Sequence, residues 1–215
     1  GVGVDIMYGT DGSGTFTSYV PRLAVENFGF NSLTFYIPRD LFSYDEWVGI
    51  LYDELQNERP IVFGGQSSEG GHAFVLEGCD TKGLFYVNWG WEGYCDGYFD
   101  VTVLNSGGAG TGAAVSEDGF CMQQDAVVYL CFEEGAGRYL APVQIASASF
   151  TSRKTSVTKA SSISLTAQNL YNFSNIDQKG YVGLVLMQGD TEVKRVESST
   201  QVTIPASKNG SYYGS

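Results

Sequence analysis

Residues 70–99 read GGHAFVLEGCDTKGLFYVNWGWEGYCDGYF, and this stretch decides the fold class. Apolar and polar residues alternate in its first part, which is typical of a β-strand with one buried face. The segment Asp80–Gly83 has the small and polar residues of a turn, and a second apolar run follows directly. The pattern predicts an antiparallel hairpin, with Gly70 and Gly71 at its open end.

The sequence around this hairpin predicts helices before it and more strands on both sides. A helix is expected from about Ser18 to Phe28, where apolar residues recur at helical spacing. A second helix is expected to begin at Ser43, which forms a capping box with Glu46. Further strands are expected in IVFGG (61–65), GYFDVTVL (97–104) and DAVVYLCF (125–132). Helices followed by consecutive strands predict an α+β domain over residues 1–137, with its sheet running as an antiparallel meander.

The composition changes after that domain. Residues 138–215 are rich in Ser, Thr and Val, in short alternating segments such as SISLTA and GYVGLVLM. Gly189 and Asp190 look like a turn that joins two strands. The alternation predicts an all-β module of the immunoglobulin-like sandwich type. Only about four or five strands fit, whereas such sandwiches use about seven, so the sandwich is expected to be incomplete.

Charge and hydropathy limit the partners of the protein. Lys and Arg number 12 against 24 Asp and Glu, so the formal net charge of -12 would repel a phosphate backbone. Nucleic acid is therefore not expected as a partner. No run approaches the roughly 20 apolar residues that span a bilayer, so no membrane span is expected. The cysteines Cys79, Cys95, Cys121 and Cys131 have no metal-site spacing and are expected to be structural thiols, whose pairing the sequence leaves open.

A glycine-rich stretch, SGGAGTGAAVSEDG, covers Ser106–Gly119. It is too long for a hairpin turn and too poor in apolar residues for a core element, which predicts a surface loop. Two interpretations remain, an insertion without function and a flap over a cleft.

His72 is the single histidine of the sequence, and the hairpin brings a candidate partner close to it. Asn88 lies near the end of the second strand, within about three residues of facing His72 on simple counting. A carboxamide oxygen that accepts a hydrogen bond from one ring nitrogen fixes the imidazole and leaves the other nitrogen free as a general base. Trp89 and Trp91 follow and would keep water off that hydrogen bond, unless they are ordinary core aromatics.

Residues 70–99 resemble the histidine-bearing motif of the streptopain and interpain cysteine peptidases, bacterial enzymes with a papain-like fold. GGHAF followed by VNWGW carries the resemblance, and VGVDIMYG, YVPRLAVENFGF, SYDEWVGILYDELQNERPI, the glycine-rich stretch and DAVVYL follow the family's order. The resemblance implies a papain-like antiparallel sheet with helices over residues 1–137. It also implies that His72 is the general base and that Asn88 orients it. Trp89 and Trp91 would be the shielding aromatics.

Members of this family carry a nucleophilic cysteine near the start of a helix, in a small-residue context that this sequence lacks. The resemblance therefore implies the C-terminal part of a catalytic domain, with the nucleophile supplied by a segment N-terminal to the chain. Cys79 is seven residues from His72, an odd offset that places it on the opposite face of an unbroken strand. Neither Cys79 nor Cys95 lies at a helix N-terminus, which would lower a thiol pKa, so neither is expected to be the nucleophile.

Three further residues are candidates for contacts with a substrate. Gln66 stands six residues before His72, and its amide could donate a hydrogen bond to the oxygen of a tetrahedral intermediate. Gly70 and Gly71 would let the backbone of a substrate approach closely.

The residues and the resemblance together predict a cysteine endopeptidase that hydrolyses polypeptides through an acyl-thioester, with no metal or organic cofactor. The resemblance also implies a bacterial protein that is secreted, periplasmic or on the cell surface, made as a zymogen with an upstream pro-segment. The alternative is a catalytically inactive homologue that binds peptides or serves adhesion. A transferase on the same Cys-His scaffold has no independent support.

Overall fold

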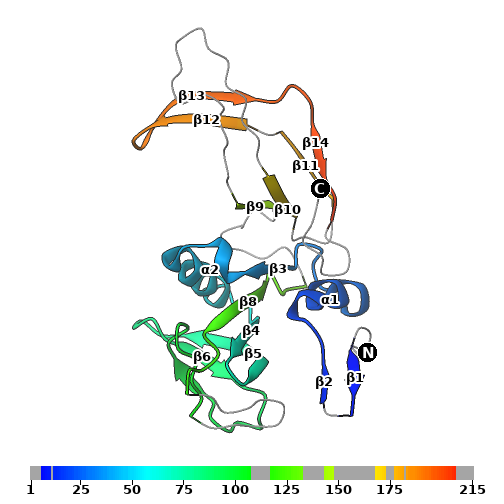
Figure 1. Ribbon diagram of the computed structural model, residues 1–215, viewed down its shortest axis with the longest axis vertical. Helices are drawn as coiled ribbons and strands as arrows, with labels where there is room; N and C mark the ends of the chain where they lie inside the picture. Colours follow the sequence, from blue (N-terminus) through cyan, green and yellow to red (C-terminus); the bar gives the residue numbers. More distant parts are fainter. Residues whose placement is uncertain are drawn as a thin grey trace.

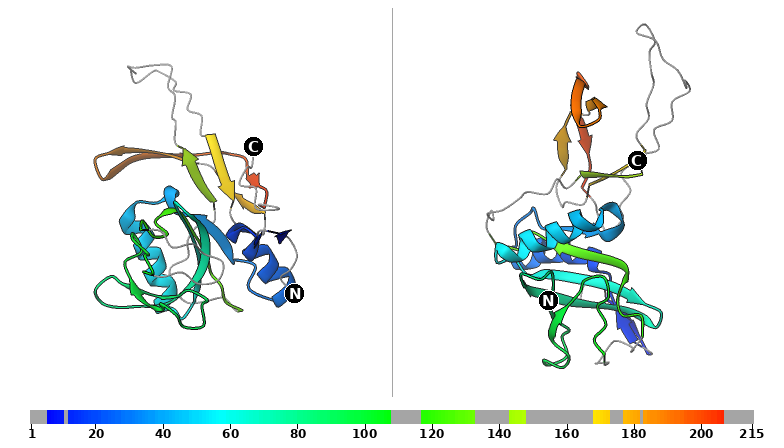
Figure 2. Two further views of the ribbon diagram at one scale, coloured as in Figure 1. Left: turned by 60° about the horizontal axis from the view of Figure 1, so that its bottom comes forward. Right: turned by 90° about the vertical axis from the view of Figure 1, so that its left-hand side faces the viewer.

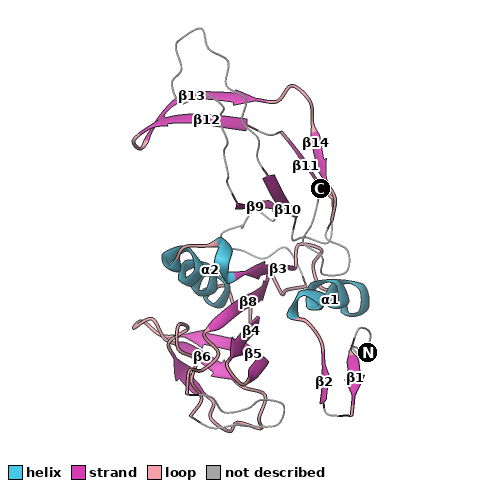
Figure 3. Cartoon of the chain, in the orientation of Figure 1, coloured by secondary structure: helices cyan, strands magenta, loops and turns pink. Residues whose placement is uncertain are grey.

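The computed structural model describes residues 6–10, 12–107, 117–132, 143–147, 168–172, 177–181 and 183–206. The helices of this part are η1 (Thr17–Tyr19), α1 (Val20–Phe28), η2 (Arg39–Leu41) and α2 (Tyr44–Gln56) (Figure 1). The strands, drawn in magenta in Figure 3, are β1 (Met7–Gly9), β2 (Gly12–Gly14), β3 (Phe35–Pro38), β4 (Ile61–Ser67), β5 (Gly70–Cys79), β6 (Phe85–Asn88), β7 (Gly97–Phe99), β8 (Met122–Val128), β9 (Val143–Ser147), β10 (Gln168–Asn172), β11 (Gln178–Gly180), β12 (Gly183–Gln188), β13 (Thr191–Glu197) and β14 (Val202–Ile204).

The central sheet has the strand order β3-β8-β4-β5-β6-β7, with every neighbouring pair antiparallel. The predicted meander is right for β4 to β7, and the predicted turn closes where the amide of Asp80 donates to the carbonyl of Leu84 at 2.9 Å. The prediction is wrong for β8, which lies between β3 and β4. Ala126, Val127 and Val128 are all buried, as expected of a central strand covered on both faces.

Both predicted helices form. The N-terminal capping box of α2 is confirmed, since the amide of Ser43 donates to the carboxylate of Glu46 at 2.9 Å and the amide of Glu46 donates to the hydroxyl of Ser43 at 3.3 Å. The first predicted helix divides into η1 and α1. Phe28, the last residue of α1, is 47% exposed, whereas Leu23 and Ala24 are buried.

The two faces of the central sheet are covered by different elements. Helix α2 packs on one face, where the ring centroid of Trp47 lies 5.9 Å from that of Phe63 (Figure 2). We call this the core face. On the opposite face, η1 lies against β4 and β8. Gly64 faces η1 and Gly65 faces Phe120 on the core face, and neither position leaves room for a side chain. A Cβ on Gly64 would lie 2.2 Å from the carboxylate of Asp125, and one on Gly65 would lie 2.5 Å from a backbone carbonyl oxygen on the core face.

The region after the central sheet contains antiparallel pairs of strands, β10 with β9, β11 with β14, and β12 with β13. The predicted turn at Gly189 and Asp190 joins β12 to β13. These pairs do not establish an immunoglobulin-like sandwich, and the predicted boundary at residue 137 lies outside the described residues. In the described part of the chain, no helix is long and apolar enough to cross a membrane.

Candidate active site

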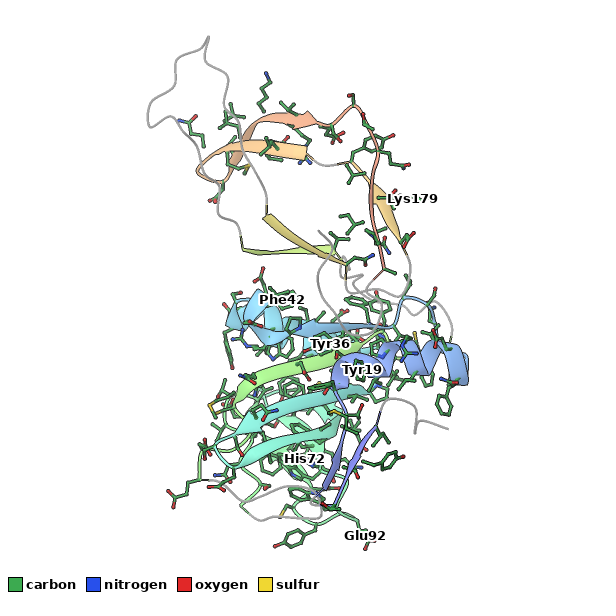
Figure 4. All side chains as sticks on the ribbon, turned by 45° about the vertical axis from the view of Figure 1, so that its right-hand side comes forward. Tyr19, Tyr36, Phe42, His72, Glu92 and Lys179 are labelled. Carbon is green, nitrogen blue, oxygen red and sulfur yellow. The ribbon has the colours of Figure 1, made fainter. Side chains whose placement is uncertain are left out.

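His72 lies near the start of β5, where it pairs with Gly65 of β4. Side chains alternate along a strand, so His72 shares the core face with Phe74 and Leu76. The two latter side chains are buried, whereas His72 is half-buried. Figure 4 labels it at the end of the sheet near the turn that carries Glu92. The imidazole therefore stands at the edge of the hydrophobic core.

Aromatic rings enclose the imidazole. The centroid of the His72 ring lies 5.0 Å from the Trp91 ring at an interplanar angle of 20°, and 6.3 Å from the Trp89 ring at 15°. Trp89 is 0% exposed and Trp91 is 7% exposed. Both tryptophans thus lie beside the ring and also belong to the core. Phe120 lies 5.6 Å from His72 and was not among the predicted site residues, because a lone phenylalanine after a glycine-rich stretch has no distinguishing sequence pattern.

The backbone of Trp89 fixes the tautomer of His72. Nε2 of His72 lies 2.9 Å from the carbonyl oxygen of Trp89. Because a carbonyl oxygen only accepts hydrogen bonds, Nε2 carries the proton and Nδ1 of the neutral ring keeps its lone pair. Burial lowers the pKa of His72, and the bond to the Trp89 carbonyl partly opposes this effect. The ring is therefore arranged to accept a proton at Nδ1.

Asn88 does not make the predicted hydrogen bond to His72. Cys79 pairs with Phe85 and Gly78 with Tyr86, but the next pair is Leu76 with Val87, so Glu77 is an extra residue that forms a β-bulge. Without the bulge, Asn88 would face Leu76 and share the face of His72. With it, Asn88 faces Val75 and lies on the opposite face, since a shift of one residue reverses the faces.

The side chain of Asn88 has other partners on that opposite face. Its Nδ2 donates to Oε1 of Glu77 at 2.7 Å, and its Oδ1 accepts from the amide of Gly90 at 2.9 Å. Next to it, the amide of Trp89 donates to Oδ1 of Asp96 at 3.0 Å. The indole Nε1 of Trp89 donates to the carbonyl of Cys95 at 3.0 Å. These bonds fix the turn after β6, and with it the carbonyl that accepts the hydrogen bond from Nε2 of His72.

Gln66, Gly70 and Gly71 do not gather around the imidazole. Gln66 pairs with Gly71, one position from the pair of Gly65 with His72, so the Gln66 side chain lies on the face opposite His72. It is exposed there, and a Cβ on Gly71 would lie 2.3 Å from its Nε2. Gly71 therefore makes room for Gln66 itself. Gly70 is exposed, with open space where a Cβ would stand.

No disulfide forms among the cysteines of the described residues, which are Cys79, Cys95, Cys121 and Cys131. The bulge at Glu77 interrupts the alternation of β5, and Cys79 packs against the hydrophobic core on the side of His72. Seven residues of strand nevertheless separate the two side chains by about 23 Å. Burial also raises the pKa of the Cys79 thiol, which disfavours the thiolate. Cys79 therefore cannot serve as a nucleophile for His72 in this structure.

Comparison with known proteins extends this picture. Residues 1–99 match the Peptidase C10 family. Streptopain from Streptococcus pyogenes is 39% identical over 128 residues, which cover 60% of this chain and 32% of streptopain. The resemblance to the streptopain and interpain cysteine peptidases is confirmed. The thiol protease/hemagglutinin PrtT of Porphyromonas gingivalis is 37% identical over 125 residues, 58% of this chain and 14% of PrtT.

A solved cysteine protease structure has a similar fold. Active wild-type interpain A, a cysteine protease of Prevotella intermedia, superposes with a TM-score of 0.51 at 32% identity, over 59% of this chain and 50% of that chain. The mixed α/β architecture with antiparallel strands is therefore similar to that of interpain A. The chain spans about a third of the length of streptopain. The Peptidase C10 match includes His72 and Trp89, whereas Phe120 lies beyond it.

Proposed function

We propose that this chain is part of a streptopain-type cysteine endopeptidase in which His72 is the general base. The observation that carries the proposal is the half-buried imidazole, with Nε2 bonded to the Trp89 carbonyl and Nδ1 free to take a proton. Its aromatic surroundings exclude water, which strengthens the electrostatic interactions of the ring. The similarity to streptopain and interpain A supplies the reaction class and implies polypeptide substrates.

In this proposal, a cysteine from a segment N-terminal to the chain gives its proton to Nδ1 of His72. The resulting thiolate attacks the substrate carbonyl and forms a C–S bond. His72 then returns the proton to the leaving amine as the C–N bond breaks, and water hydrolyses the acyl-thioester. The carbonyl of Trp89 stabilises the imidazolium, because it accepts a hydrogen bond from Nε2–H whether the His72 ring is neutral or charged.

Asn88 takes a different role in the proposal from the one its sequence position predicts. It acts as a positioning residue through the turn after β6, where its Oδ1 holds the amide of Gly90 next to the Trp89 carbonyl. An oxyanion role for Gln66 is not part of the proposal, because its side chain lies on the face opposite His72.

The wider setting of the protein is also part of the proposal. We propose a zymogen of a bacterial protein, exported to the periplasm, the cell surface or the medium, with residues 1–137 as peptidase and 138–215 as an incomplete immunoglobulin-like module. The bacterial relatives support the origin. The antiparallel strand pairs from β9 to β14 are compatible with such a module.

The decisive experiment uses the longer protein that includes the upstream segment. His72→Ala should lower casein hydrolysis by at least about a thousandfold, because the base of a nucleophile–imidazole pair is lost. It should also slow alkylation of the nucleophilic thiol near neutral pH, because the imidazolium no longer stabilises the thiolate. Asn88→Ala is the matched control on the same hairpin, and it should lower turnover by much less.

Unchanged alkylation in His72→Ala would overturn the thiolate–imidazole pair. A wild-type protein that binds casein without cleaving it would support the alternative, an inactive peptide-binding homologue. This alternative is worth testing because, within the part of the chain that the structure describes, the hydrogen bond of the His72 ring goes to a carbonyl oxygen and not to a sulfur.

A further inference from the structure

Strand β8 carries a β-bulge at the level of His72. Gly64 pairs with Asp125 and Gln66 pairs with Met122, so Gln123 and Gln124 together face the single residue between them in β4. That residue is Gly65, which pairs with His72 on its other side. Bulges change the direction of a side chain and are common next to active sites. Here Gln123 has a φ of 44°, in the sparsely populated left-handed region, and its side chain is exposed.

The bulge sends the neighbouring side chain, Gln124, into the protein. Gln124 is 6% exposed, and its Nε2 donates to the carbonyl oxygens of Val101 at 2.7 Å and Phe120 at 3.1 Å. Both protons of the amide nitrogen are used by these two bonds. A buried carbonyl without a donor costs about 1–3 kcal/mol, so replacing this amide leaves two acceptors without their partner.

Phe120 connects Gln124 to the imidazole. It is 4% exposed, its ring lies 5.6 Å from that of His72, and its carbonyl oxygen packs against Gly65. The same short segment is tethered at a second point. The backbone amide and hydroxyl of Ser68, in the turn before His72, donate to the two carboxylate oxygens of Asp118 at 3.0 and 3.1 Å.

We propose that Gln124 is a positioning residue of this site, which holds Phe120 against His72 through the Phe120 carbonyl. The inference rests on the proposed role of His72 as the general base. Phe120 is one of the aromatic rings beside the imidazole, together with the two tryptophans and Phe74, and Gln124 holds Phe120 in place from the bulge in β8. The tether from Asp118 to Ser68 holds the same segment less strongly, because both partners are exposed.

The single histidine of the sequence allows a direct test, because the 215-residue chain gives one set of imidazole signals by NMR. Gln124→Met keeps the volume of the side chain and removes both donors. Phe120 should then move away and admit water. Solvent exchange of the His72 Nε2 proton should become about tenfold faster, the factor for a lost hydrogen bond of about 1.4 kcal/mol. The pKa of His72 should rise toward its ordinary value, because the ring is less buried.

Two controls separate positioning from general loosening. Gln123→Met changes the other amide of the same bulge and should leave both His72 signals unchanged. The backbone amide of Tyr129, which donates to Glu54 at 2.8 Å, reports on the rest of the domain and should keep its exchange rate in Gln124→Met. In the longer, active protein, Gln124→Met should lower kcat with little change in KM, because it disturbs the base and not substrate binding.

The proposal is overturned if a folded Gln124→Met variant keeps the wild-type exchange rate and pKa of His72. It is also overturned if exchange of the Tyr129 backbone amide accelerates equally, because the Gln124 side chain would then only stabilise the domain as a whole. If Gln124→Met does not fold, Asp118→Ala is the second test. It removes the hydrogen bonds to Ser68 at an exposed position and so loosens the segment that carries Phe120. Faster exchange at His72 supports the proposal, and no change contradicts it. None of these signals needs a nucleophile, so a failure of this inference can be told apart from a failure of the peptidase proposal.

Discussion

A buried guanidinium and a half-buried imidazole lie near opposite ends of β4 and are held in different ways. Before the strand, Arg59 forms a bidentate ion pair with Glu54, with Nε–Oε2 at 2.9 Å and Nη2–Oε1 at 2.7 Å. The amide of Tyr129 donates to the same carboxylate, and the guanidinium lies 4.7 Å from the centre of the Tyr129 ring. Near the other end of the strand, the one hydrogen bond that His72 makes among the described residues goes to a carbonyl oxygen.

The difference separates a structural polar group from a reactive one. The hydrogen bond and charge of Glu54 raise the pKa of Arg59, so the guanidinium stays charged and its Nε and Nη2 atoms are held by the Glu54 side chain. Burial lowers the pKa of His72, and Nδ1 stays available. Arg59 is the more deeply buried of the two groups, so burial alone does not identify a functional site. A functional site is better indicated by an oriented ring with a titratable atom, here Nδ1 of His72, that is available to take a proton.

The largest effect on stability is expected at the ion pair. Arg59→Met should lower the free energy of unfolding by about 3–5 kcal/mol, because it leaves the carboxylate of Glu54 buried without its partner. Urea denaturation of the variant measures this. The double variant Glu54→Leu/Arg59→Met should recover most of the loss, since no buried charge remains. An equal loss in His72→Gln would erase the distinction between the two ends of β4.

A smaller effect is expected at Gly65. Gly65→Ala places a methyl group 2.5 Å from the carbonyl oxygen of Phe120, which is backbone and has to shift, at a cost of about 1–3 kcal/mol. The imidazole signals of His72 should change with it. Gly49→Ala is the matched control, since Gly49 lies within α2 with open space around it, and there alanine should stabilise by about 0.5–1 kcal/mol. A destabilisation of the same size at both glycines would contradict the close packing.

The smallest effect is the dependence of stability on pH. The folded protein holds the pKa of His72 below its ordinary 6.5, so the unfolded chain binds the proton more readily. The contribution of His72 is therefore complete above pH 6.5 and is lost as the pH falls from there through the folded pKa. His72→Gln should flatten the fall in stability below pH 6.5, measured by urea titration at several pH values.

Asp125 should act in the opposite direction at lower pH. Burial raises its pKa above 3.8, so it favours the folded state most when protonated, and that contribution is lost as the pH rises above 3.8. Asp125→Asn should therefore be more stable than the wild type at neutral pH. It should lose this advantage in acid, which distinguishes its titration from that of His72.

Local sequence signals predict much of the fold. The capping box at Ser43, the turn after Asp80 and the alternation of β5 act over a few residues, and each one forms as expected. The pairing of β8 between β3 and β4 is a nonlocal choice, decided by burial of both faces of β8. No short pattern contains that information.

The candidate site was predictable only in part for the same reason. His72 is distinguished by its neighbours in the sequence. The register between β5 and β6, however, depends on a bulge at Glu77 that the alternating pattern of the sequence does not indicate. The carbonyl of Trp89 has no residue type to search for, because every residue carries one. Phe120 comes from a strand connection far along the chain, and its contact with His72 exists only after β8 has joined the sheet.

The carbonyl acceptor of His72 has a consequence for mutational tolerance. No amino-acid replacement at position 89 deletes a main-chain oxygen, so an alanine scan would report this interaction only indirectly, through whatever bends the chain. The orientation of the His72 ring therefore depends on the backbone conformation between Asn88 and Asp96. Substitutions in this loop are therefore expected to preserve the orientation of the ring only where they keep the side-chain hydrogen bonds of Asn88 and Asp96.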